Sequence, residues 1–221
     1  MPDIEITAAD GHVLAAYVTG AADAPRGLVV AQEIFGVNSH MRNVADRFAA
    51  AGYRVIVPAL FDRVERGVAL GYTAPDVARG RELRAPIDAH KTLLDVLAAA
   101  AALPAGIPRG IVGYCWGGTV AWHGATRSKA FGAASGWYGG GIAAAKDEAP
   151  NCPVQMHFGE TDASIPMADV EAIRTAQPGV ELHVYAGAGH GFGCDERGSF
   201  SPPDAALAQE RTLAFLARAL A

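Results

Sequence analysis

The sequence predicts an α/β fold in which a mostly parallel central sheet is covered by helices on both faces. Short apolar runs without alternation, such as residues 27–31, are typical of strands that are buried on both faces. Helical segments separate these runs, so that strand and helix alternate along the chain. At the start, the turn signal Asp10-Gly11 lies between two predicted strands, 4–7 and 13–18, and indicates an opening hairpin.

The remaining elements follow in order. After a strand at 27–31, Asn38 or Ser39 can cap a helix, and a strand at 53–57 stops at Pro58. The stretch 59–75 has no clear period and is predicted to be a surface excursion. A long helical segment, 76–102, is expected to kink at Pro86. The rest is predicted as strands at 111–114, 130–136, 154–158 and 181–185 and helices at 116–126, 166–176 and 205–221, the last with Leu207, Leu213, Phe215 and Leu216 on its apolar face.

The bulk properties narrow the class of protein. A length of 221 residues suits one domain, residues 1–221. The net charge of −5 comes without a basic run, so nucleic acid is not expected as a partner. The acidic N-terminus is unlike a signal peptide, and the longest apolar run, 96–103, is far shorter than the roughly 20 residues that cross a membrane. We therefore expect a cytoplasmic protein, with no membrane partner, that is a monomer.

The segment Gly113-Tyr114-Cys115-Trp116-Gly117-Gly118 lies between a predicted buried strand and a predicted helix. This is the pattern of a nucleophile elbow, G-x-Nu-x-G, with cysteine as the nucleophile. A strand that turns abruptly into a helix strains the nucleophile, and side chains two residues away on either side would clash. The helix N-terminus favours a thiolate, and the amide of Trp116 can face a developing oxyanion.

Other uses of this turn are less well supported. A dinucleotide site would need a glycine at the position of Cys115 and an acid after the next strand, and the sequence has neither. A phosphate-binding loop is excluded because no Gly-Lys-Ser/Thr follows. A buried, inert cysteine beside a tight turn remains the alternative. The three cysteines form no CxxC pair, so neither a disulfide framework nor a zinc site is expected.

An elbow of this kind needs an acid and then a base in loops that leave later strands. Strand 154–158 runs into a loop with Glu160 and Asp162, and strand 181–185 runs into a glycine-rich loop with His190. Asp162 is preferred over Glu160 because it lies later in its loop. The predicted architecture is therefore an α/β-hydrolase fold without a cap domain, with the catalytic residues Cys115, Asp162 and His190.

At this point the chain resembles the dienelactone hydrolase family, the carboxymethylenebutenolidase-like enzymes. The segments that carry the resemblance are 32–38 (QEIFGVN), 113–118 (GYCWGG), 187–192 (GAGHGF) and 210–216 (ERTLAFL). It implies a cysteine-dependent hydrolase of esters or lactones, acting through a Cys-His-Asp triad and a covalent acyl-enzyme, with no metal or other cofactor. The expected partner is a small enol-lactone that bears a carboxylate.

The resemblance also implies roles that spacing alone does not show. The amides of Ile34 and Trp116 would form the oxyanion hole, and Glu33 would hold the resting cysteine as a neutral thiol. The substrate would be bound by Phe35, Tyr138 and one of two arginines, Arg79 or Arg81, between which the sequence does not decide. A carboxylate beside sulfur disfavours a second negative charge, which gives the role of Glu33 a physical basis.

One position departs from the family pattern. A second arginine is expected four residues after the histidine, where this chain has Cys194, either an exposed thiol or a spacer. Loss of a bidentate carboxylate partner puts dienelactone itself in doubt as the substrate. A broad-specificity carboxylesterase and a non-catalytic carboxylate-binding homologue are therefore kept as alternatives. A glutamine amidotransferase-like enzyme is disfavoured, because Phe192 replaces the acid expected two residues after the histidine.

Overall fold

The hairpin expected at the start of the chain is present in the computed structural model, which describes residues 4–221. β1 (Ile4–Thr7) pairs antiparallel with β2 (Val13–Thr19), and Gly11 adopts a φ of 82° in the turn. The chain divides into two units, Met1–Gly110 and Ile111–Ala221. The prediction of a single domain stays a prediction, and residues 1–3 of the acidic N-terminus lie outside the described residues.

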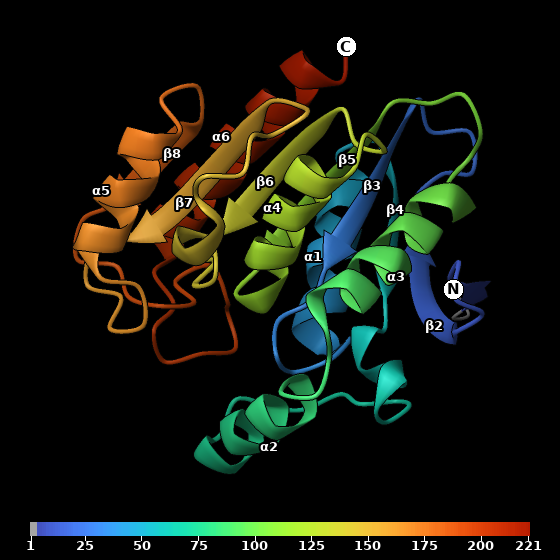
Figure 1. The fold of residues 1–221 in the computed structure, drawn as a ribbon, viewed down its shortest axis with the longest axis horizontal. Helices are drawn as coiled ribbons and strands as arrows, with labels where there is room; N and C mark the ends of the chain where they lie inside the picture. The colour runs from blue at the N-terminus through green and yellow to red at the C-terminus, as the bar shows by residue number, and fades with distance from the viewer. Residues whose placement is uncertain (1–3) are drawn as a thin grey trace. The chain divides into compact units, whose positions relative to one another are not determined.

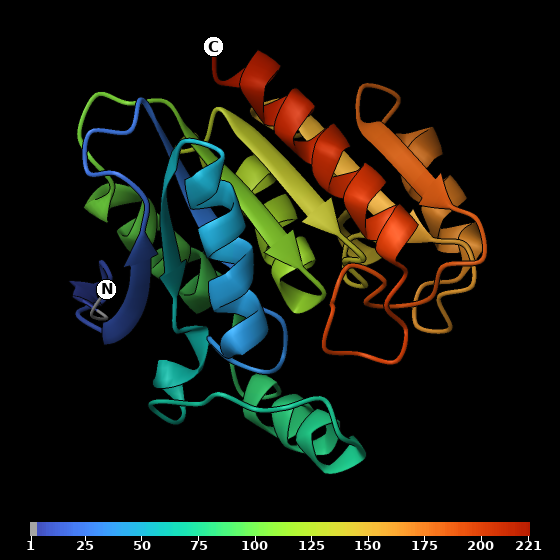
Figure 2. The same cartoon turned by 180° about the vertical axis from the view of Figure 1, so that it is seen from behind.

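In the first unit the strands follow the order β1-β2-β4-β3. β4 (Tyr53–Pro58) runs antiparallel to β2 and parallel to β3 (Arg26–Ala31). α1 (Ser39–Ala50) covers one face of these strands and α3 (Ala89–Ala102) covers the other (Figures 1 and 2). Asn38 caps α1, since its Oδ1 accepts a hydrogen bond of 3.2 Å from the amide of Met41. This cap fixes where the loop after β3 ends.

Two predictions for residues 59–102 are wrong. The stretch after β4 is not wholly a surface excursion, because it opens with the 3₁₀ helix η1 (Leu60–Arg63), in which Leu60 and Phe61 are buried. The helical segment 76–102 is not one kinked helix but two, α2 (Ala74–Arg84) and α3. Pro86 has no amide to donate, and Asp88 caps a new helix by accepting from the amide of His90 at 2.7 Å.

The elements of the second unit are β5 (Arg109–Tyr114), α4 (Trp116–Arg127), β6 (Ala133–Trp137), η2 (Ala143–Ala145), β7 (Val154–Gly159), α5 (Met167–Ala176), β8 (Glu181–Tyr185) and α6 (Pro202–Ala219). The strands follow the order β5-β6-β7-β8. β6 and β7 pair in parallel, as do β7 and β8. α4 and α5 lie on one face and α6 on the other (Figures 1 and 2). Parallel pairing within both units agrees with the predicted sheet.

The predicted apolar face of α6 needs one correction. Leu207 is 40% exposed, whereas Thr212 is fully buried in the interior of the second unit. Thr212 Oγ1 accepts a hydrogen bond from Trp137 Nε1 at 3.2 Å and lies 3.0 Å from Nε2 of His157. Burial, followed by the charges of His183 and Arg211, holds the pKa of His157 well below its usual value. A polar network therefore forms part of the buried face of α6, which the apolar pattern did not include. Among residues 4–221, no helix combines the length and apolar character that a bilayer crossing requires.

Candidate functional site

Cys115 lies at the turn from β5 to α4 with φ 54° and ψ −117°. Positive φ is uncommon for a residue with a side chain, and it marks stored strain. The glycines explain how the turn is possible: a Cβ on Gly113 would lie 1.8 Å from the carbonyl oxygen of Gly117. The amide of Cys115 donates to the carbonyl of Trp137 on β6 at 2.9 Å. The local backbone is therefore the strained elbow that the motif predicts.

The structure joins the side chains of the three predicted catalytic residues by hydrogen bonds within the second unit. Nε2 of His190 lies 3.2 Å from Sγ of Cys115, and Nδ1 of His190 lies 2.7 Å from Oδ2 of Asp162. The side chain of Asp162 is fully buried, and that of His190 is 20% exposed. The amide of Ser164 donates to the other carboxylate oxygen of Asp162 at 2.8 Å. This chain of contacts has the order needed to move a proton to or from sulfur.

The environment of His190 changes its acidity. Burial lowers its pKa, but the hydrogen bonds to Asp162 and Cys115 outweigh burial and raise the pKa to about 10. The imidazolium form is therefore favoured at neutral pH. A positive charge at this position stabilises a thiolate on Cys115 and provides a proton for a departing group.

Tyr138, predicted to line a substrate pocket, is fully buried beside His190. It directly follows β6, has a φ of 41°, and its ring centroid lies 5.2 Å from that of His190. The ring of Phe192 packs edge-on against that of Tyr138, with the centroids 5.5 Å apart. The ring of Tyr138 limits how far the imidazole can rotate, because it occupies the space beside it.

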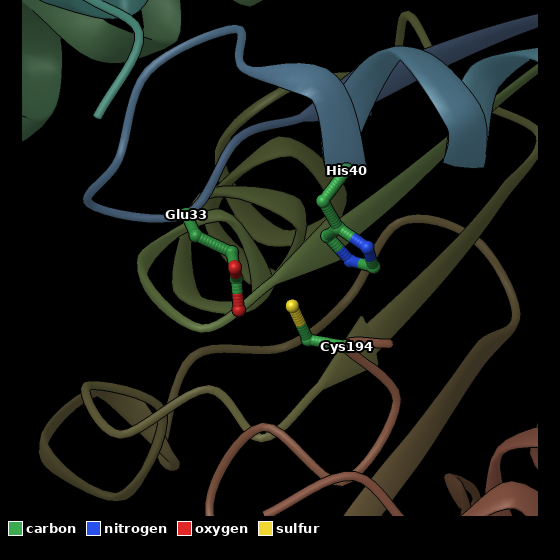
Figure 3. A group of neighbouring side chains, drawn as sticks. All are labelled: Glu33, His40 and Cys194. Atoms are coloured by element: carbon green, nitrogen blue, oxygen red, sulfur yellow. The ribbon is translucent and has the colours of Figure 1, made fainter. Parts of the chain in front are cut away.

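Glu33, Ile34 and Phe35 follow β3 in the first unit. The carboxylate of Glu33 is fully buried and accepts a hydrogen bond of 3.1 Å from the hydroxyl of Tyr72. Figure 3 draws Glu33 and, from the first turn of α1, the buried His40; it also draws Cys194 of the second unit. The ring of Phe35 lies 4.5 Å from that of Tyr72. The prediction that no metal or cofactor takes part stays a prediction.

Sequence reasoning missed two residues, Tyr72 and Gly80, that contact residues 33–35. Tyr72 also accepts a hydrogen bond of 3.1 Å from Nδ2 of Asn38, so its hydroxyl links Asn38 to Glu33. Gly80, on α2, approaches the backbone so closely that a Cβ there would lie 1.9 Å from the carbonyl oxygen of Ile34. Tyr72 lies in the stretch 59–75, where apolar residues show no regular spacing, so the sequence gave no sign of its bond to Glu33. The requirement for Gly80 arises from contact with a distant segment.

The two arginines predicted to bind the substrate, Arg79 and Arg81, both lie on α2. Arg79 forms ion pairs with Glu65 and Glu82, the latter at 2.9 Å, whereas Arg81 is exposed on α2.

Cys194 is fully buried, so the expectation of an exposed second thiol is wrong. Its burial follows from the loop 191–201, which folds back so that the amide of Cys194 donates to the carbonyl of Gly191 at 2.9 Å.

Comparison with known proteins identifies the family of the chain. The model of the dienelactone hydrolase family matches residues 14–220. The carboxymethylenebutenolidase of Pseudomonas putida is 34% identical over 233 residues, which cover 97% of this chain and 95% of that protein. A Synechocystis protein assigned as a carboxymethylenebutenolidase is 37% identical over 203 residues, covering 83% of this chain and 82% of that one.

A solved structure extends the likeness to the fold. A Klebsiella pneumoniae protein assigned as a dienelactone hydrolase superposes with a TM-score of 0.82 at 31% identity, covering 99% of this chain and 100% of the other. This match confirms the predicted α/β-hydrolase fold. The chain belongs to the dienelactone hydrolase family and is a hydrolase that acts on ester or lactone bonds.

Proposed function

We propose that this protein hydrolyses a small enol-lactone bearing a carboxylate, related to dienelactone, through Cys115, His190 and Asp162. The observation that carries the proposal is the hydrogen-bonded chain from Sγ of Cys115 through His190 to the buried Asp162. The strained backbone of Cys115 at the start of α4 supports it, because such a turn holds a nucleophile at a helix N-terminus. The similarity to the carboxymethylenebutenolidase of Pseudomonas putida supports the substrate class.

In the proposed mechanism, the thiol proton of Cys115 is held by His190 as the imidazolium, and the thiolate Sγ attacks the carbonyl carbon and forms a C–S bond. The amides of Trp116 and Ile34 stabilise the oxyanion, and collapse of the tetrahedral intermediate breaks the C–O bond of the ester or lactone. His190 gives its proton to the departing oxygen. It then takes a proton from water as the water attacks the thioester, the C–S bond breaks, and the acid is released. Asp162 orients the imidazole and stabilises its charge throughout.

A quenched-reaction experiment tests this mechanism. With p-nitrophenyl acetate, we expect a burst of nitrophenol and an intact mass that is higher by one acetyl group, both absent in Cys115→Ala. Turnover that survives in Cys115→Ala would contradict the assignment of the nucleophile. A non-catalytic homologue would show neither burst nor adduct in the wild-type protein. Cys152→Ala is the matched control because burial raises the pKa of the Cys152 thiol to about 11, which makes it a poor nucleophile.

We further propose that Glu33 keeps the thiol of Cys115 neutral until substrate arrives. Two influences oppose one another: a protonated His190 favours thiolate, whereas a neighbouring carboxylate disfavours it. If Glu33 dominates, Glu33→Gln accelerates alkylation of Cys115 by iodoacetamide at pH 7 by about tenfold. Digestion and mass analysis identify the alkylated cysteine. An unchanged or slower rate means that His190 already sets the ionisation of the thiol.

One observation favours a second candidate, a broad-specificity carboxylesterase. Arg79 is paired with Glu65 and Glu82, and the buried Cys194 has no charge to offer a substrate carboxylate. Comparison of kcat/KM for a carboxylate-bearing enol-lactone and for neutral nitrophenyl esters distinguishes the two candidates. Preference for the lactone supports the first. The monomeric state, the absence of nucleic acid and membrane partners, and the cytoplasmic location stay predictions.

A further inference from the structure

The loops that present Asp162 and His190 come from neighbouring parallel strands. The first loop follows β7, and the second, residues 186–191, follows β8. One direct contact joins their functional side chains, the 2.7 Å hydrogen bond between His190 and Asp162. The position of one loop relative to the other must therefore be set by contacts outside this pair.

The backbones of the two loops are in close contact. The amide of Glu160 donates to the carbonyl of Tyr185 at 3.0 Å, and the amide of Thr161 donates to the carbonyl of Ala188 at 2.9 Å. A Cβ on Gly159 would lie 2.4 Å from the carbonyl oxygen of Ala188. Backbone hydrogen bonds thus extend the contact between the two chain segments by two residues, Glu160 and Thr161, beyond the end of β7.

Two side chains reinforce this approach. The carboxylate of Glu160 accepts a hydrogen bond of 2.9 Å from the amide of Gly187. The hydroxyl of Thr161 donates to the carbonyl of Ala188 at 2.9 Å, with the carbonyl of Gly187 at 3.2 Å. We call these contacts of Glu160 and Thr161 with Gly187 and Ala188 the loop brace. In the first loop it ends one residue before Asp162, and in the second it ends two residues before His190.

The side-chain part of the loop brace contributes little to global stability. Glu160 and Thr161 are exposed, so water competes for the same donors and acceptors. Catalytic geometry is far more sensitive than stability, since a displacement of about 1 Å can cost about a hundredfold in rate. A hydrogen bond that adds little to the free energy of unfolding can therefore still raise kcat, because it fixes the relative position of two loops that carry proposed catalytic residues.

We propose that Glu160 and Thr161 are positioning residues: they tie the Asp162 loop to the His190 loop and keep the imidazole aligned with its carboxylate. The inference rests on the proposed function. It also gives Glu160 a role different from that of an alternative triad acid, because its carboxylate bonds to the amide of Gly187 while Asp162 bonds to His190.

The test compares variants that remove or keep the bonding atoms. Thr161→Val has the same shape but no hydroxyl, and we expect kcat for p-nitrophenyl acetate to fall about tenfold while KM changes less than about twofold. Thr161→Ser keeps the hydroxyl and should restore kcat. Thr175→Val is the matched control, because Thr175 donates at 2.8 Å to the carbonyl of Glu171 on α5, away from both loops. The Nδ1–H proton resonance of His190 should shift in Thr161→Val and not in Thr175→Val.

Glu160 supplies an independent arm. Glu160→Ala removes the acceptor and should lower kcat, whereas Glu160→Gln keeps an acceptor oxygen and should leave kcat close to wild type. If Glu160→Gln is as inactive as Cys115→Ala, Glu160 is the triad acid and the loop brace is wrong. Wild-type kcat and an unshifted His190 resonance in Thr161→Val also overturn it. Activity that survives in Cys115→Ala instead overturns the proposed function itself, so the two failures can be told apart.

Discussion

Asp162→Asn is expected to lower kcat by about a thousandfold or more while leaving the fold intact. Asparagine has nearly the same shape but no charge, so it cannot stabilise an imidazolium on His190. The amide can also face Nδ1 with its NH₂ group, which selects the wrong tautomer. The buried carboxylate has no water to replace this loss, because its side chain has no exposed surface.

Asp162→Asn should also change how kcat and the free energy of unfolding depend on pH. The pKa of His190 is about 10, with the hydrogen bond to Asp162 as the largest influence that raises it and burial opposing it. Without the carboxylate, burial prevails and the pKa falls toward or below the ordinary 6.5. The basic limb of the kcat profile should therefore move to lower pH. The folded-state pKa is raised, so the stability that Asp162 confers is complete below pH 6.5 and is lost as the pH rises through about 10.

Two measurements check this prediction: the pH dependence of kcat, and urea unfolding of wild type and variant at pH 6 and pH 10. The stability difference should be larger at pH 6. Asp169→Asn, in the first turn of α5, is the control and should leave both profiles unchanged. An unchanged basic limb in Asp162→Asn would show that another group sets the ionisation of His190.

Gly113→Ala is expected to destabilise the protein by at least about 3 kcal/mol and to remove most of its activity. A methyl group at Gly113 would lie 1.8 Å from the oxygen and 2.2 Å from the carbon of the Gly117 carbonyl. Both atoms belong to backbone in the first turn of α4, which cannot yield as a flexible side chain would. Relief requires the elbow to open, which moves Cys115 away from His190.

Urea unfolding and the acyl-enzyme burst measure the two effects. Gly179→Ala is the matched control, because no atom lies within 4 Å of a Cβ built there and its φ is not positive. That variant should unfold at the wild-type midpoint or slightly above it. A soluble Gly113→Ala protein with wild-type stability and a full burst would show that the elbow is not the rigid turn described above.

The elbow and the order of its partners could be predicted because they depend on local rules. A nucleophile between two glycines at a strand–helix junction is a short-range pattern, and loops that leave parallel strands must meet at one edge of a sheet. The choice of Asp162 over Glu160 rested on loop position alone, and the contact with His190 agrees with it.

The features that sequence reasoning missed depend on distant contacts. Thr212 is buried on α6 because Trp137, 75 residues earlier, donates to it. Tyr72 gains its place from Asn38 and Glu33, and periodicity does not report such a bond. Pro86 was predicted to kink a helix, but whether a proline bends or ends a helix depends on the residues that follow, and Asp88 restarts the chain as α3.

The proposed nucleophile, acid and base are encoded in one stretch of the gene, apart from the two arginines proposed to bind the substrate. Cys115, Asp162 and His190 are all encoded after residue 110, where the second unit begins, whereas Arg79 and Arg81 are encoded before it. On the proposed roles, a mutant library confined to the codons of α2 would explore substrate preference without touching the acid, base or nucleophile. For laboratory evolution, a library that also keeps Gly80 fixed lowers the fraction of variants that have lost the nucleophile, acid or base, because those codons are unchanged.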